Sequence, residues 1–124
     1  MANPNIVNTT TITGNTTYLS LSSTSATTLL SNAASSGKVY KVNSIIVAND
    51  DGSNSATITV SVHTAASGGG TAYKLAHTLS VATDSTLVVI DKTTPIYLTE
   101  DKSITVTASA ANDLDVVCSY EEIS

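Results

Sequence analysis

The sequence predicts an all-β protein, an antiparallel β-sandwich of jelly-roll-like order with about 8–10 short strands. Two features of the composition and one of the pattern support this. Thr and Val are abundant, and β-branched side chains fit a pleated strand better than a helix. Only 4% of the residues are aromatic, with no Trp and no Phe, so the core must be built from aliphatic side chains. Short apolar runs alternate with Gly, Asn, Asp and Ser clusters, and no window shows a capped helical period.

The strands follow from these runs and from the turn residues between them. The Asn49–Gly52 segment suits a tight hairpin, because Asn, Asp and Gly tolerate positive φ. Ser67–Gly70 is expected to form a flexible loop tip, and Ala111–Asp113 is expected to close the final hairpin. An immunoglobulin-like order is less favoured, because the Cys…Trp…Cys pattern is missing. The predicted strands span residues 5–12, 16–21, 26–31, 38–49, 56–64, 72–82, 86–91, 95–98, 102–109 and 114–123.

Three of these runs alternate between apolar and polar residues, which predicts one buried and one more polar face, as in a two-sheet sandwich. The predicted buried sets are Ile58, Val60 and Val62 in the first run; Tyr73, Leu75, His77, Leu79 and Val81 in the second; and Leu114, Val116, Cys118 and Tyr120 in the third.

Two other runs, residues 45–47 and 87–90, are apolar on both faces. Because the outer face of a small sandwich normally meets water, such runs favour a contact with another subunit. Residues 1–14 are Asn- and Thr-rich with little apolar surface, which predicts an N-terminal arm or edge strand. Residues 15–124 are then expected to form a single β-sandwich domain.

The charge pattern disfavours nucleic acid and anionic membranes as partners. The chain has a net charge of −5, and its five cationic residues are scattered lysines. Binding to phosphates needs a cluster of Lys and Arg that displaces counterions. The single Cys118 excludes an intramolecular disulfide. The N-terminus shows no basic and apolar pattern of a signal peptide, and no apolar run is long enough for a membrane span. We therefore expect a chain made in the cytoplasm.

No group of residues has the spacing of a catalytic or metal site, and we expect no cofactor. His63 and His77 are predicted on opposite kinds of face, His77 on the apolar one, without accompanying ligands. Residues 50–54 resemble a calcium loop only superficially, because they lack its ligand alternation and terminal Glu. The adjacent acidic pairs 100–101 and 121–122 would point to opposite faces of a strand, unlike a glycosidase dyad.

Two further candidates have plain structural interpretations. Cys118 shares the phase of Leu114 and Val116, which predicts a buried and inert thiol. Gly68–Gly70 lacks the Lys-Ser/Thr and the following helix of a phosphate loop. We therefore expect a non-enzymatic protein.

Four segments of the chain carry a resemblance to a known family: residues 3–7 (NPNIV), 37–49 (GKVYKVNSIIVAN), 95–98 (PIYL) and 119–123 (SYEEI). They resemble small virion structural proteins of tailed phages, especially of marine cyanophages, and the resemblance covers nearly the whole chain. It implies a β-sandwich protein built into the particle, as a capsid decoration (cement) protein, and no catalytic residue can be carried over from it.

The resemblance and the apolar runs together lead to an expected mode of assembly. The partners would be copies of the chain itself, as in a trimer, and the major capsid protein or another virion protein. A neck or tail component is an alternative, and a carbohydrate-binding module is another, for which the five Tyr residues are the only aromatic candidates, with Tyr73 and Tyr120 expected to face the core. The expected interface residues are Ile6, Val7, Ile12, Ile45, Val47, Val88 and Ile90.

Overall fold

The structure, a computed structural model, describes residues 3–124 and contains nine strands and one short 3₁₀ turn. No helix among these residues has the length and apolar character needed to span a membrane. The elements are β1 (Ile12–Ser20), β2 (Thr27–Asn32), β3 (Val39–Asn49), β4 (Ala56–His63), η1 (Ala66–Gly68), β5 (Ala72–Val81), β6 (Thr86–Ile90), β7 (Ile96–Leu98), β8 (Lys102–Ala108) and β9 (Leu114–Ile123).

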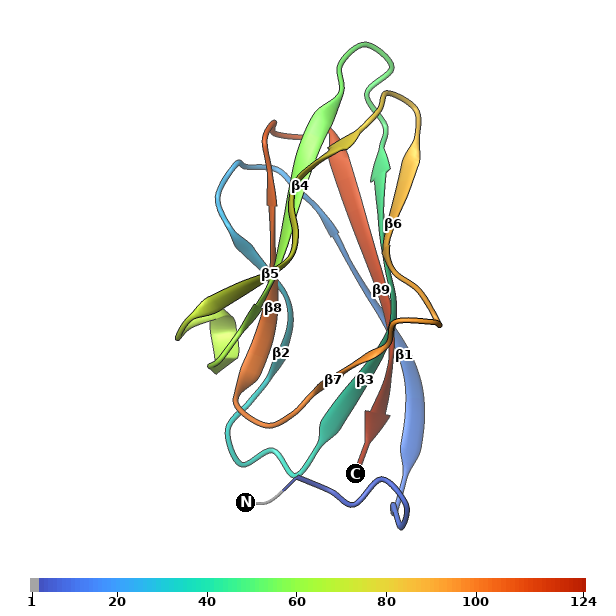
Figure 1. The fold of residues 1–124 in the computed structure, drawn as a ribbon, viewed down its shortest axis with the longest axis vertical. Helices are drawn as coiled ribbons and strands as arrows, with labels where there is room; N and C mark the ends of the chain where they lie inside the picture. The colour runs from blue at the N-terminus through green and yellow to red at the C-terminus, as the bar shows by residue number, and fades with distance from the viewer. Residues whose placement is uncertain (1–2) are drawn as a thin grey trace.

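The strands form two antiparallel sheets that face each other as a sandwich (Figure 1). The five-stranded sheet has the order β1-β9-β3-β6, and β7 pairs with β3 beyond the end of β6. The four-stranded sheet has the order β2-β8-β4-β5. Most connections pass from one sheet to the other, while β4–β5 and β6–β7 stay within a sheet. The fold is therefore all-β with jelly-roll-like crossings, as predicted.

Two turns that were predicted to close hairpins instead connect one sheet to the other. The turn after Asn49 joins β3 of the five-stranded sheet to β4 of the other sheet, and the turn at 111–113 joins β8 to β9 across the same gap. The chain does turn at both places, although none of residues 49–52 has the positive φ that Asn, Asp and Gly tolerate. Turn residues also do not determine whether the next strand stays in the same sheet. The buried amide of Asn49 stabilises its turn: it donates to the carbonyls of Asn54 and Val81, both at 3.0 Å.

The core between the sheets is aliphatic, as the composition required. Its fully buried side chains come from both sheets, and burial alternates along β9 and the first half of β4, which confirms Ile58 and Val60 in β4 and the β9 set from Leu114 to Cys118. Tyr40 and Tyr120 pack together at one end of the core, with ring centroids 5.2 Å apart. Burial raises the pKa of both hydroxyl groups.

The N-terminal strands differ from the prediction. Residues 5–11 do not form a strand; β1 instead runs continuously from Ile12 to Ser20 and pairs with β9 over its whole length. The preceding segment is attached through Thr11 and Ser124, whose backbones exchange two hydrogen bonds of 3.1 and 3.0 Å. Residues 12–14 therefore belong to β1, which is an edge strand, one of the two alternatives predicted for residues 1–14.

The predicted phase of β5 is wrong over most of the strand. Ala76 and Val81 are buried, whereas Tyr73 is 64% exposed and Leu79 is 45% exposed. Thr78 has a φ of +48°, and the pairing with β4 shifts register on both sides of Val60. β5 is also an edge strand, so its inner face is only partly covered. A bulge of this kind shifts the alternation that the sequence displays.

Candidate interaction surface

An apolar row crosses the outer face of the five-stranded sheet. In the register of the four strands, Tyr18 lies opposite Val117, Val117 opposite Ile46, and Ile46 opposite Val88. Their chain neighbours point into the core, as the complete burial of Val116 shows, so these four side chains point outward. Tyr18 is 73% exposed and Val88 is 54% exposed. We call Tyr18, Val117, Ile46 and Val88 the outer row.

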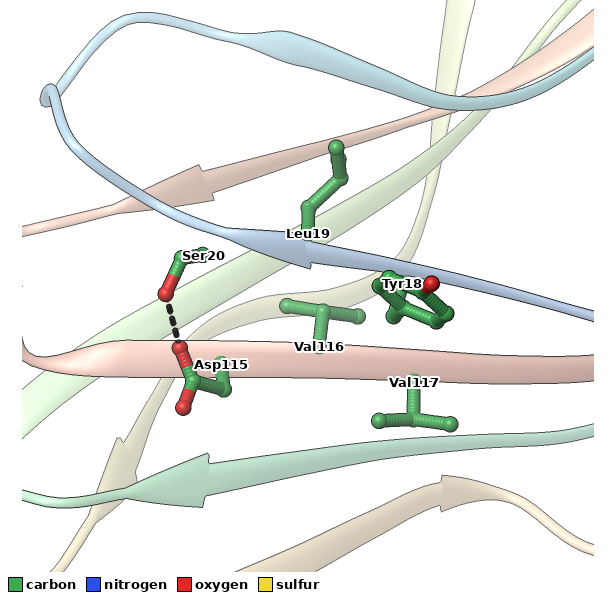
Figure 2. A pocket seen from close by; sticks show the side chains of 6 residues that line it. All are labelled: Tyr18, Leu19, Ser20, Asp115, Val116 and Val117. Carbon is green, nitrogen blue, oxygen red and sulfur yellow. Dashed lines mark hydrogen bonds between the residues drawn. The ribbon is translucent and has the colours of Figure 1, made fainter.

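The outer row lies between rows of small and polar residues. On one side the register aligns Thr16, Ser119 and Ser44. On the other side it aligns Ser20, Asp115, Ala48 and Thr86, and the hydroxyl of Ser20 donates to the carboxylate of Asp115 (Figure 2). An apolar strip with a polar margin has the composition expected of the centre and rim of a protein interface.

Four residues of the two-sided runs 45–47 and 87–90 were expected at an interface, and for three of them this prediction is wrong. Ile45, Val47 and Ile90 were expected at an interface, but all three are buried in the core, at 0, 0 and 5% exposure. Their neighbours Ile46 and Val88 face outward instead. Pairing between β3 and β6 shifts register between Ile45 and Ile46, so the sequence period alone could not settle which residues face out. Among the residues of these two runs that were expected at an interface, only Val88 lies at the surface.

The N-terminal residues expected at the interface are exposed but lie apart from the outer row. Ile6 is 48% exposed and Val7 is 91% exposed, both in the segment before β1. Ile12 is 59% exposed at the start of β1, opposite Ile123. The structure therefore does not join these three residues and Val88 into one patch along the sheet register.

The expected interface residues did not include Tyr18, Val117 and Ile46. A signal for Val117 was present, because Val116 and Val117 make that part of β9 apolar on both faces. The same was true of Ile46 within its run. Tyr18 and Leu19 are likewise two consecutive apolar residues, but which of them faces outward follows from pairing with a strand almost a hundred residues away.

A hollow of about 280 Å³ lies along the strand pair of β1 and β9, at one end of the outer row. Its lining is mainly apolar, and Ser20 and Asp115 contribute polar side chains (Figure 2). Because that hydroxyl and that carboxylate bind each other, the hollow resembles a contact surface more than a catalytic pocket. Tyr18, Leu19, Ser20, Asp115, Val116 and Val117 line it.

The two histidines have the reverse of their predicted environments. His77 is exposed on β5, whereas His63 is half-buried. The ring of His63 lies 2.8 Å from the hydroxyl of Thr105 through Nε2 and 3.2 Å from the carbonyl of Gly69 through Nδ1. Both ring nitrogens therefore have structural partners, and His63 fastens the loop that follows its own strand.

Hydrogen bonds to other parts of the chain anchor the loop that follows His63, so the prediction of a flexible tip is wrong. The backbone N–H groups of Ala66, Ser67 and Gly68 donate to side-chain oxygens of the chain itself. Three successive N–H groups of this kind can bind an anion, but here the chain's own oxygens occupy them. The acceptors are Asp101 at 3.0 Å, Ser31 at 2.9 Å and Ser103 at 2.8 Å.

The acidic candidates are also engaged within the chain. Asp51 accepts the backbone N–H of Ser53 at 2.8 Å and the amide of Asn54 at 3.3 Å, and these bonds lower the pKa of Asp51. Glu122 pairs with Lys38 at 2.5 Å, and this pair raises the pKa of Lys38. Among residues 3–124 there is no cluster of three or more His, Cys, Asp or Glu that could hold a metal.

Cys118 is buried as predicted, at 0% exposure. Its surroundings are aliphatic, and burial raises the pKa of the thiol to about 12. A thiol in this environment stays protonated and unreactive at neutral pH.

Comparison by sequence finds no relative: no protein-family model matches the chain, and no curated protein matches it. Comparison of the fold does find similar structures. A chain of the Bacillus endospore appendages, described as disulfide-linked pili, is 18% identical with a TM-score of 0.54, over 92% of this chain and 88% of that one.

Two viral structures are also similar. A chain of the T13 IBDV viral particle is 11% identical with a TM-score of 0.50, and the match covers 93% of this chain but 31% of that one. A chain of the capsid of Helicobacter pylori bacteriophage KHP30 is 12% identical with a TM-score of 0.49, over 94% and 90% of the two chains. This protein is thus a two-sheet antiparallel β-sandwich whose fold is distantly similar to a chain of the T13 IBDV viral particle and to a chain of the Bacillus endospore appendages.

Proposed function

We propose that this protein is a structural component of a phage particle and decorates the assembled shell as a cement protein. The observation that carries the proposal is the outer row, an apolar strip on a sheet face that the sandwich core does not need. The resemblance of the sequence to phage virion proteins supports the location. The fold also supports it, since this sandwich occurs in a viral particle and in surface appendages, both of which are assemblies.

The mechanism is thermodynamic. A protein that binds only the mature shell stabilises that state by mass action. Val88 and Tyr18 are more than half exposed in the isolated chain, so their contact with a shell protein would remove apolar surface from water. Each such side chain contributes on the order of 1–2 kcal/mol when buried. A stable contact needs about 800 Å² from each partner, so the outer row would form the centre of a larger footprint.

A neck or tail component remains the second candidate, because it would use the same kind of surface. Copy number separates the two. Quantitative mass spectrometry of purified particles should find hundreds of copies per particle if the protein covers the shell. A dozen copies or fewer would contradict the cement role and assign the chain to the neck or tail.

A further inference from the structure

The outer edge of β1 is unusual among the sheet edges of the described residues. Edge strands expose unpaired backbone groups, and proteins usually protect them with charges, Pro, bulges, short length or a covering segment. β1 has nine residues, ITGNTTYLS, without a charge or a Pro, and its pairing with β9 shows no register shift. It is therefore a long, regular and uncharged edge.

Each of the other edges has a protective feature. β5 carries Lys74 and has register shifts, and β2 has a register shift and lies against η1. β6 and β7 have five and three residues. β1 is thus the edge best suited to accept another strand.

The hydrogen bonds at both ends of β1 identify which of its backbone groups point outward. Thr11 and Leu21, which are odd-numbered and continue the register of β1, bond to the β9 side through Ser124 and Leu114. Antiparallel ladders alternate, so the even-numbered residues of β1 direct their N–H and C=O groups away from β9. In agreement, the N–H of Thr16 contacts the side chain of its neighbour Asn15 at 3.2 Å.

We propose that β1 pairs antiparallel with β1 of a second copy, across a two-fold axis at Thr16. In this register Ile12 lies opposite Ser20 of the second copy, and Thr16 lies opposite Thr16 of the second copy. The whole length of β1 is therefore paired. Every hydrogen-bonded pair in this register joins even-numbered residues, which are those with outward backbone groups. The two sheets then become one continuous sheet. Because β1 has no charge, two chains of net charge −5 meet along neutral strands.

The same register gives Gly14 a function. Glycine in the interior of a strand destabilises the strand relative to other residues. Gly14 does not have a positive φ, and no atom lies within 4 Å of a Cβ placed there. Nothing within the described chain therefore requires glycine at this position. In the pair, Gly14 lies opposite the partner's Tyr18, and an aromatic ring laid over an edge glycine shields its exposed backbone. Tyr18 is available for this, being 73% exposed.

The contact goes beyond the cement role, because it needs no shell and can be measured on the isolated protein. It is also a different arrangement from the trimer expected from the sequence. A dimer that does not bind shells would refute the proposed function alone, and a monomer that binds shells would refute the β1 contact alone.

Charge variants at Thr16 give a sharp test, since this residue would face its own copy. Thr16→Lys and Thr16→Glu should each weaken the dimer roughly five- to tenfold in sedimentation equilibrium, because like charges would lie opposite each other. An equimolar mixture of the two variants should form a heterodimer, visible as a mixed-mass species in native mass spectrometry. Thr24→Lys and Thr24→Glu, in the exposed loop after β1, are the matched controls and should dimerise like the wild type.

Gly14→Val provides a second test that does not depend on charge. The new side chain fits the isolated chain, where space is open, but would displace the partner's Tyr18. Melting curves recorded at a concentration where both proteins are monomeric should therefore match or exceed the wild type, while dimerisation at higher concentration weakens. A wild-type chain that stays monomeric up to millimolar concentration would overturn the proposal. So would a trimer, an open-ended series of oligomers, or a dimer unaffected by both Thr16 variants.

Discussion

Ile46 on β3 lies opposite Val117 on β9, and both side chains point out of the five-stranded sheet. Their neighbours Ile45, Val47 and Val116 are buried in the core on the other side of the same strands. The two central strands of this sheet are therefore apolar on both faces, although only one face is needed for folding. That surplus is the physical basis for the proposal that the protein is part of an assembly.

Replacing Val88 with Asp should prevent binding to shells without unfolding the protein. The side chain is 54% exposed, so a carboxylate there stays solvated in the isolated chain and the free energy of unfolding should change by less than about 1 kcal/mol. Buried in an interface, an unpaired carboxylate costs several kcal/mol. Co-sedimentation with shells that lack the protein measures binding. Ser80→Asp on β5, in the other sheet, should bind normally; equal binding of both variants would exclude the outer row.

Two N-terminal deletions should differ in stability. Removing residues 1–9 keeps all of β1 and the hydrogen bonds between Thr11 and Ser124. Removing residues 1–14 eliminates those bonds and three residues that pair with β9. The longer deletion should lower the free energy of unfolding by about 1–3 kcal/mol more than the shorter one, as urea denaturation can determine. Equal stabilities would show that the start of β1 contributes nothing to the fold.

His63→Ala should destabilise the protein by about 1–2 kcal/mol, because it leaves Thr105 and the carbonyl of Gly69 without their partner. Amide hydrogen exchange should accelerate at residues 66–69, the loop that this ring holds. His77→Ala is the control and should change stability by less than about 0.5 kcal/mol, since His77 is exposed. If the two variants were equally stable, the bonds of His63 would carry no net stabilisation.

Cys118 should react with thiol reagents only after unfolding, and it should make stability fall at high pH. Burial raises the pKa of the thiol from 9.0 to about 12 in the folded protein. Stabilisation by the neutral thiol is complete below pH 9 and is lost as the pH rises from 9 toward 12, because only the unfolded chain releases the proton there. The slope reaches about 1.4 kcal/mol per pH unit.

Cys118→Ala isolates this contribution from the tyrosines and lysines that titrate in the same range. The variant should be less stable at neutral pH, by about 1 kcal/mol, because it leaves a small cavity. Its stability should decline less steeply above pH 9 than that of the wild type, as urea denaturation across the range would show. Parallel declines would contradict the assignment to this thiol.

The sequence was sufficient for the fold class and for strands whose alternation is regular, such as β9 with Leu114, Val116 and Cys118 inside. It was insufficient where a bulge intervenes. At Ile45 and Ile46 the register shift decides which face is buried, and in β5 the positive φ of Thr78 accompanies the loss of the expected alternation. Long-range pairing is the other limit: the outward position of Tyr18 depends on β9, which local pattern does not reveal.

The most direct test is cryo-electron microscopy of the particle that carries this chain. The cement role predicts density for the sandwich across the outer surface of the shell, with Val88 and Ile46 covered by a neighbouring virion protein. A particle in which the chain occupies the shell but its outer row faces solvent would contradict the assigned surface. Density confined to the neck or tail, or none at all, would contradict the function.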